Sequence, residues 1–297
     1  MVDIEITTPR GARLAGTLID PVDSTDAAVI FSHPLLCDRE SSPHFPELAA
    51  KYRALGYATL IFDYSGHGLS DDQPITMDRR TEDLRAASGW LADQGFTRQV
   101  LHAHSTGSIS ALKSGARAVK AVFLSSPITG PMDFDWEAIF SPEQLEELEK
   151  NLVTRIKDDS PGPRTFFELT PQTLLDLSLN SEEELLEGLS VPTFALFDEL
   201  DVERGVSTGV ASLSARLPAH SVVEVARETD FSQAKNLDRL GDIVVRWALR
   251  NVPPRPDATY ENVFKAADKQ TARSRVLRPG PADMDDPGLE DKGTDSE

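Results

Sequence analysis

One serine stands in a setting that could make it a nucleophile. Ser105 lies in the pentapeptide Ala-His-Ser-Thr-Gly, between an apolar run at residues 100–103 and a short stretch with helical spacing at 108–113. A serine on a sharp turn between a strand and a helix needs small residues two positions away on either side, and Ala103 and Gly107 meet that need. The turn lifts the hydroxyl out of the sheet edge, and the helix N-terminus favours negative charge beside it. The pattern therefore predicts a catalytic serine, although such a pentapeptide also surrounds ordinary surface serines.

Two further motifs follow earlier apolar runs. Residues 27–32 lead into His-Pro-Leu-Leu at His33, and residues 58–62 lead into Asp-Tyr-Ser-Gly-His-Gly-Leu-Ser at Asp63. Together with the pentapeptide, these motifs resemble the α/β-hydrolase superfamily. Its members carry His-Gly after the third strand, Asp-x-x-Gly-His-Gly-x-Ser after the fourth and Gly-x-Ser-x-Gly after the fifth. The resemblance covers residues 1–252 and is greatest to the small-cap serine esterase, acylhydrolase and aminopeptidase branch.

The resemblance implies roles for residues around Ser105. The triad acid follows the seventh strand of the family, where Asp201 stands, with Asp198 as the second choice. A solvated acidic loop is the competing interpretation of both aspartates. The oxyanion hole is implied to use the backbone N–H groups of Leu35 and Thr106.

The triad histidine of the family has no counterpart here. After the last apolar run the chain reads Ala-Arg-Glu-Thr-Asp-Phe-Ser from Ala226, and no histidine follows His220. His220 precedes that run, so we place it at the opposite end of the sheet. Loss of the histidine costs roughly 10⁶ in turnover in subtilisin, so another group must act as base if this chain hydrolyses esters.

The residues that could replace the histidine are of two kinds. His67 is the first candidate, with His33 and His44 nearby in sequence, although the resemblance implies loop-supporting roles for His33 and His67. Glu228 and Asp230 are the others. Neighbouring carboxylates raise one another's pKa, and a pair sharing a proton could act as a general base for elimination or proton abstraction rather than for acyl transfer.

These observations leave three functions open. The first is a serine hydrolase for an ester or thioester of a small apolar acyl compound. The second is a non-hydrolytic lyase or eliminase of a small-molecule pathway, and the third is an inactive pseudo-hydrolase that serves as a binding module. Aromatic residues that could line an apolar pocket, or only pack a cap, are Phe134, Trp136, Phe140, Phe166 and Phe167.

The elements that must position these residues alternate in kind. Short apolar runs without polar alternation are typical of parallel strands covered on both faces. The predicted strands are residues 2–7, 13–19, 27–32, 58–62, 100–103, 121–124, 193–197 and 222–226. Helical spacing recurs at residues 45–55, 80–94 and 236–250. The order predicts the α/β-hydrolase fold, with a mostly parallel eight-stranded sheet flanked by helices.

Two segments fall outside this alternation. Between residues 124 and 193 we expect no strand, only helices at 142–156 and 170–189, which predicts a small helical cap inserted at about residues 128–190 of a hydrolase domain spanning 1–252. Residues 253–297 form an acidic tail that we expect to be largely disordered, with at most a marginal helix at 258–272.

Composition limits the remaining choices. The chain has 297 residues, 30 Lys and Arg against 49 Asp and Glu, and a formal net charge of −19. Such a charge disfavours nucleic acid as a partner. Cys37 is the only cysteine, which excludes an intramolecular disulfide. We find no secretory signal, transmembrane run or metal-ligand spacing. We therefore expect a soluble cytoplasmic protein with a small-molecule substrate, no cofactor, no metal and no membrane partner. The sequence leaves the oligomeric state open, with a homodimer as one option.

Overall fold

The computed structural model divides the chain into two units, Met1–Tyr260 and Glu261–Glu297. The residues that it describes all belong to the first unit. They are 1–40, 44–160, 162–203, 209–226 and 234–258. The predicted tail from residue 259 on, and with it nearly all of the marginal helix, lies outside the described residues.

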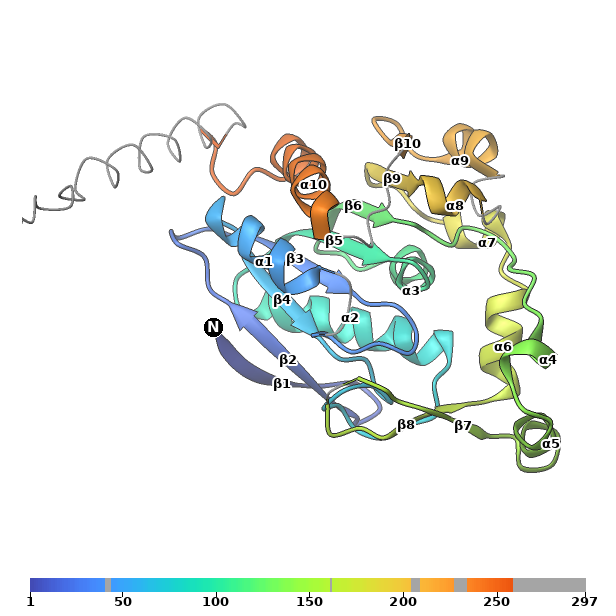
Figure 1. The fold of residues 1–297 in the computed structure, drawn as a ribbon. Coiled ribbons are helices and arrows are strands. Elements are labelled where there is room, and N and C mark those ends of the chain that lie inside the picture. Colours follow the sequence, from blue (N-terminus) through green and yellow to red (C-terminus); the bar gives the residue numbers. More distant parts are fainter. Residues whose placement is uncertain (41–43, 161, 204–208, 227–233, 259–297) are drawn as a thin grey trace, which may run out of the picture. The chain divides into compact units, whose positions relative to one another are not determined.

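An eight-stranded sheet forms the centre of this unit (Figure 1). Its order is β1-β2-β4-β3-β5-β6-β9-β10; the first three strands pair antiparallel and the others parallel. The strands are β1 (Val2–Thr7), β2 (Arg13–Ile19), β3 (Ala27–Ser32), β4 (Ala58–Phe62), β5 (Arg98–His104), β6 (Val119–Ser125), β9 (Thr193–Asp198) and β10 (Val222–Ala226). This arrangement confirms the predicted fold class.

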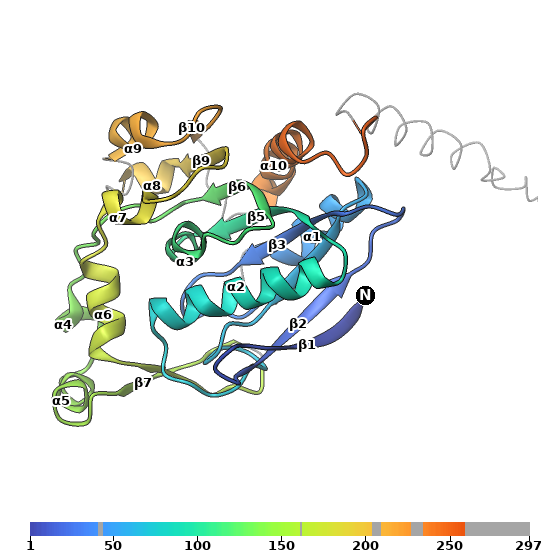
Figure 2. The same ribbon diagram turned by 180° about the vertical axis from the view of Figure 1, so that it is seen from behind.

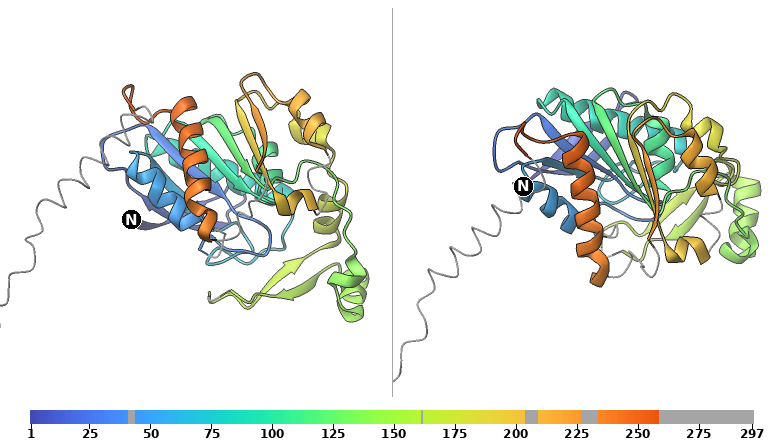
Figure 3. Two further views of the ribbon diagram at one scale, coloured as in Figure 1. Left: turned by 45° about the horizontal axis from the view of Figure 1, so that its top comes forward. Right: turned by 90° about the horizontal axis from the view of Figure 1, so that it is seen from above.

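Helices cover both faces of the sheet. Helices α1 (Phe45–Ala54) and α10 (Leu237–Asn251) lie on one face, and α2 (Met77–Asp93) and α3 (Gly107–Ser114) lie on the other (Figures 1 and 2). The view from above in Figure 3 shows the sheet between these two layers. All residues of β3 and β4 are buried, because each of these strands has a helix layer on both faces.

The insertion between β6 and β9 differs from the prediction. It contains α4 (Trp136–Ile139), α5 (Pro142–Asn151), α6 (Pro171–Ser178) and α7 (Glu182–Leu186), but also an antiparallel hairpin of β7 (Thr154–Lys157) and β8 (Phe166–Leu169). The expectation of helix up to residue 156, with no strand in the segment, was therefore wrong.

Local chemistry explains where these helices end. Leu152 adopts the left-handed conformation with φ 59°, so α5 ends at Asn151, the residue before it. The hairpin that follows buries alternate side chains, among them Phe167. The predicted helix at 170–189 is also two helices, because the Ser181 side chain accepts a hydrogen bond from the Glu184 N–H and starts α7 afresh.

Short elements complete the unit. They are α8 (Glu199–Glu203), α9 (Val210–Arg216) and the 3₁₀ turn η2 (Ala234–Asn236). Within the part of the chain that the structure describes, no helix has the length and apolarity needed to cross a membrane.

Candidate active site

The turn between β5 and α3 holds Ser105 in a strained conformation. Its φ is 49°, which is uncommon for a residue with a side chain. Its N–H donates to the Ser125 carbonyl at 3.0 Å, which ties the turn to β6. Its carbonyl accepts from the Ser108 N–H at 2.9 Å and from the Ser108 hydroxyl at 2.6 Å. Ser105 itself is half-buried, and its hydroxyl bonds to no other described residue. The turn thus presents a hydroxyl that no described residue uses for structure.

Gly107 lets α3 approach the end of β3. A β-carbon on Gly107 would meet the Ser32 carbonyl oxygen and would lie 2.9 Å from that of His33. The Ser32 hydroxyl donates to the Gly107 carbonyl at 2.9 Å across the same contact. The small residue two positions after Ser105 is therefore required by the neighbouring strand.

The predicted oxyanion donors lie on the two sides of this contact. The Leu35 N–H does not point at open space: it donates to the Thr106 side-chain hydroxyl at 2.6 Å. The Thr106 N–H, at the start of α3, donates to no other described group. The structure thus brings Leu35 and Thr106 together, and of their two amides only that of Thr106 has no partner among the described residues.

The predicted acid lies in the turn after β9. Asp201 accepts from the Asp198 N–H at 2.9 Å, and Asp198 accepts from the Asp201 N–H at 3.0 Å. This reciprocal pair is a capping box that starts α8. Burial raises the pKa of Asp201, while a hydrogen bond from the Ser126 side chain opposes the rise. Ser126 directly follows Ser125, which anchors the Ser105 amide, so the acid turn and the serine turn meet at the end of β6.

His67 is not free to act as a base. Its Nδ1 faces the Ser65 carbonyl at 3.0 Å, and its Nε2 faces the Arg80 guanidinium at 3.2 Å. A guanidinium can only donate, so Nε2 accepts and Nδ1 carries the proton. Burial, and then the charge of Arg80, holds the pKa of His67 well below its usual range. The described contacts place no nitrogen of His67 on Ser105, so the structure does not support this predicted base.

His33 has the same arrangement. Its Nδ1 faces the Pro34 carbonyl at 2.7 Å, and its Nε2 accepts from the Tyr64 N–H at 3.2 Å. Burial, and then Arg80, holds the pKa of His33 well below its usual range as well. His33 therefore shapes the loop that leads to Leu35, which matches the supporting role that the resemblance implied.

Sequence reasoning missed Arg80. Its side chain is fully buried, donates to the His33 carbonyl at 2.5 Å and lies 3.9 Å from the Tyr64 ring centroid. The available signal was its spacing, because Arg80 continues the stripe of Leu84 and Leu91 on α2 and thus faces the sheet. Arg80 joins the loops after β3 and β4 that flank the site.

Two other histidines lie beside the serine turn. His104 contacts the Ser125 hydroxyl through Nδ1 at 3.0 Å, and burial lowers its pKa to about 4. His44 precedes α1 with φ 63°, and its buried Nε2 has no hydrogen-bond partner among the described residues.

The two carboxylate candidates, Glu228 and Asp230, lie outside the described residues. Strand β10 ends at Ala226, which pairs with Asp198 of β9. His220, by contrast, lies two residues before β10, at the opposite end of the sheet, and is exposed, as expected.

The cap aromatics divide into two groups. Phe140 and Phe167 are buried in a cap cluster with Ile75, so they pack the insertion. Phe134 and Trp136 are half-buried and stacked, with ring centroids 4.7 Å apart. Trp136 and Leu35 both pack against that same cap cluster, which brings an aromatic surface towards the loop after β3.

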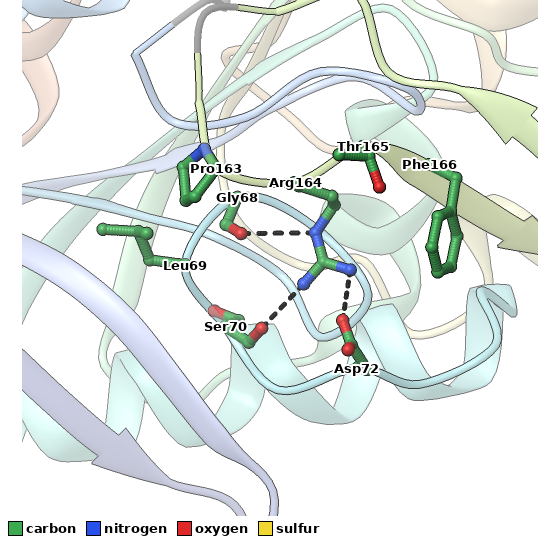
Figure 4. Close-up of a pocket in the computed structure, with 8 residues that line it drawn as sticks. All are labelled: Gly68, Leu69, Ser70, Asp72, Pro163, Arg164, Thr165 and Phe166. Atoms are coloured by element: carbon green, nitrogen blue, oxygen red, sulfur yellow. Dashed lines mark hydrogen bonds and ion pairs between the residues drawn. The ribbon is translucent and has the colours of Figure 1, made fainter.

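A hollow of about 270 Å³ lies between the loop after β4 and the β7–β8 hairpin (Figure 4). Arg164 crosses it and donates to the carbonyls of Gly68 at 3.2 Å and Ser70 at 2.8 Å, and it pairs with Asp72 at 2.5 Å. Ser105 does not line this hollow. The Arg164 guanidinium is already bonded to Gly68, Ser70 and Asp72, so the hollow is a place where the insertion contacts the loop after β4 and not a substrate site.

The described residues hold no group of three or more His, Cys, Asp or Glu side chains that could bind a metal ion. Cys37 is half-buried, and burial raises the pKa of its thiol.

Solved structures of known proteins share this fold. DcsB, solved in complex with a substrate analogue, is 18% identical with a TM-score of 0.69 over 84% of this chain and 99% of its own. Est1E from Butyrivibrio proteoclasticus, solved with ferulic acid, is 18% identical with a TM-score of 0.62 over 84% and 99%. The Pyrococcus furiosus esterase Pf2001 is 18% identical with a TM-score of 0.60 over 84% and 90%. No curated protein matches the chain.

A sequence model of one family agrees with the geometry above. The model of the alpha/beta hydrolase family matches residues 29–260, which include the motif after β3, the motif after β4, the Ser105 turn and the acid turn. With the strained serine turn and the sheet order already in place, this match over most of the chain identifies the protein as a member of the alpha/beta hydrolase family.

Proposed function

We propose that this protein is a serine hydrolase that cleaves an ester or thioester of a small apolar acyl compound. The observation that carries the proposal is the Ser105 turn, where φ is 49° and the hydroxyl has no structural bond to a described residue. A strained residue persists only where its surroundings enforce it, and such residues cluster at functional sites.

In the proposed reaction, the Ser105 oxygen forms a bond to the acyl carbonyl carbon, and the carbonyl electron pair moves onto the oxygen. The backbone N–H of Thr106 stabilises that charge. When the pair returns, the bond to the alcohol or thiol breaks and leaves an acyl-serine. Water then attacks the acyl-serine by the same route, which releases the acid and restores the serine.

The proton of Ser105 needs an acceptor, and we assign it to the carboxylate of Glu228 or Asp230. Glu228 and Asp230 are the second and fourth residues after β10, whose last residue pairs with Asp198 next to the acid turn. The carboxylate takes the serine proton and then delivers it to the leaving oxygen or sulfur. Asp201, whose pKa is raised by burial, would share a proton with that base and hold it in place.

The substrate class follows from charge and surface chemistry. A net charge of −19 disfavours highly anionic substrates. The stacked Phe134 and Trp136 offer an apolar surface for an acyl group. Ester cleavage is also the activity named for the Pyrococcus furiosus esterase, which shares the fold.

A fluorophosphonate probe tests the proposal directly, because it reacts covalently with activated serines. We expect the wild-type chain to be labelled and to hydrolyse p-nitrophenyl butyrate above the buffer rate, whereas Ser105→Ala loses both. Ser114→Ala is the matched control, since Ser114 lies at the far end of α3 and bonds only within the helix and to Arg85.

The same assay identifies the base. Of Glu228→Gln and Asp230→Asn, the variant that removes the proton acceptor loses about 10²–10⁴ in turnover, and the other stays near wild type. An unlabelled wild type whose turnover equals buffer would eliminate the hydrolase.

A further inference from the structure

A hydrogen bond joins the Leu35 amide to the Thr106 hydroxyl beside the serine turn. At 2.6 Å it is short, and Thr106 is buried. An oxyanion hole made of two backbone amides needs both N–H groups directed at the same oxygen. Here the Leu35 N–H already donates to the side chain of Thr106, and Thr106 carries the second amide of the pair.

The packing around Gly107 enforces this contact. Because Gly107 has no β-carbon, α3 approaches the Ser32 carbonyl closely, and the Ser32 hydroxyl bonds to the Gly107 carbonyl at 2.9 Å. The Ser32 hydroxyl is itself bonded to the Tyr64 hydroxyl at 2.6 Å. These bonds hold the first turn of α3 against the loop after β3, so the Thr106 hydroxyl stays beside the Leu35 amide.

The Thr106 hydroxyl can still donate its own proton. A hydroxyl has one donor and two acceptor sites. The Leu35 N–H takes an acceptor site, and among the described residues no acceptor receives the Thr106 O–H. The proton therefore remains available next to the Thr106 N–H, at the residue that follows Ser105.

We infer that Thr106 supplies both oxyanion donors, its backbone N–H and its side-chain O–H, and that the Leu35 amide acts through the hydroxyl. This inference rests on the proposed hydrolase. A hydrogen bond accepted by a hydroxyl polarises its O–H, so the Leu35 amide strengthens the donor without touching the substrate. Direct donation by Leu35 would require the 2.6 Å bond to break and would leave a buried hydroxyl without that partner.

Replacing the hydroxyl by a methyl group separates the two alternatives. Thr106→Val keeps the shape of the side chain, removes the O–H and frees the Leu35 N–H. We expect it to lower kcat for p-nitrophenyl butyrate, and the rate of fluorophosphonate labelling, by about 10²-fold with KM changed less than about threefold. Thr106→Ser restores the hydroxyl and should recover both rates to within a few-fold. Thr81→Val is the control, since Thr81 is equally buried, donates to the Met77 carbonyl at 2.7 Å and lies in α2.

The outcomes distinguish this inference from the proposed function. If Thr106→Val is labelled and turns over as fast as wild type, or faster, Leu35 donates directly and the inference is wrong while the hydrolase stands. If the wild-type protein is neither labelled nor active, the proposed hydrolase function is wrong, and the inference about Thr106, which rests on it, is wrong as well. Should the valine variant not fold, Thr106→Ala replaces it, with the same expected loss. Equal losses in the serine and valine variants would also overturn the role of the hydroxyl.

Discussion

Two polar regions meet at the end of β3, and they use their hydrogen bonds in opposite ways. Behind the loop, His33 and His67 have both ring nitrogens engaged, and the buried Arg80 donates to the His33 carbonyl and to the His67 ring. At the serine turn, the hydroxyls of Ser105 and Thr106 keep protons that no described residue accepts. The first region holds its loops in one arrangement, and that rigidity lets the second leave its donors free for a ligand.

The comparison also explains why two histidines so near the serine are not bases. Burial removes water that would stabilise an imidazolium, and the Arg80 cation disfavours a second positive charge. Both rings therefore stay neutral and serve as fixed donor and acceptor pairs. Proximity to a nucleophile does not make a histidine catalytic when its lone pair is already used.

Gly107→Ala should have the largest effect, because it separates the two regions. Its β-carbon would collide with backbone oxygens of Ser32 and His33, which cannot move aside as a side chain can. We expect a loss of roughly 3 kcal/mol or more in the free energy of unfolding, together with more than tenfold lower fluorophosphonate labelling.

Chemical denaturation checks that result against Gly89→Ala. A β-carbon on Gly89 meets nothing within 4 Å, and Gly89 lies inside α2, so this variant should be neutral or up to about 1 kcal/mol more stable. Equal stability of the two variants would show that β3 and α3 are not in close contact.

Arg80→Met tests the region of His33 and His67 without changing a residue of the serine turn. It leaves the His33 carbonyl and the His67 Nε2 without their donor, which should cost about 3 kcal/mol in the free energy of unfolding. Thermal unfolding and urea titration measure the loss. Arg79→Met, which removes only a bond to the Pro74 carbonyl on a half-buried side chain, should cost less than 1 kcal/mol. If both variants behave alike, the buried cation does not hold the loops.

His102→Phe extends the comparison to a third buried histidine, which does not contact Arg80. His102 stacks on Phe31, its Nε2 has no described partner, and burial lowers its pKa to about 3. The unfolded chain takes up a proton below about pH 6.5 while the folded chain does not, so this residue destabilises the fold as the pH falls.

The expected difference is measured by urea titration at two pH values. The difference in free energy of unfolding between His102→Phe and wild type should shift by about 2 kcal/mol in favour of His102→Phe when the pH is lowered from 7 to 5. A pH dependence that is the same in wild type and His102→Phe would contradict the buried, neutral state of His102.

Elements with a local pattern could be predicted well. The bounds of β3, β4 and β10 are as expected. For β3 and β4 the reason is that uninterrupted apolar runs mark strands covered on both faces. The β7–β8 hairpin could not be predicted in this way, since Ile156 is explained only by its pairing with Phe167 across the hairpin. Arg80 was missed for a related reason: burial of a cation depends on partners from other parts of the chain.

The sequence by itself determined the serine turn, because its requirements are local: a small residue on each side of Ser105, a strand before it and a helix after it. Only the tertiary structure decided which donors face that turn. The Leu35 amide and the Thr106 hydroxyl are 71 residues apart in the chain, and their contact exists because β3 pairs beside β5 and Gly107 allows α3 to approach. Long-range packing of this kind leaves no mark on any short stretch of sequence.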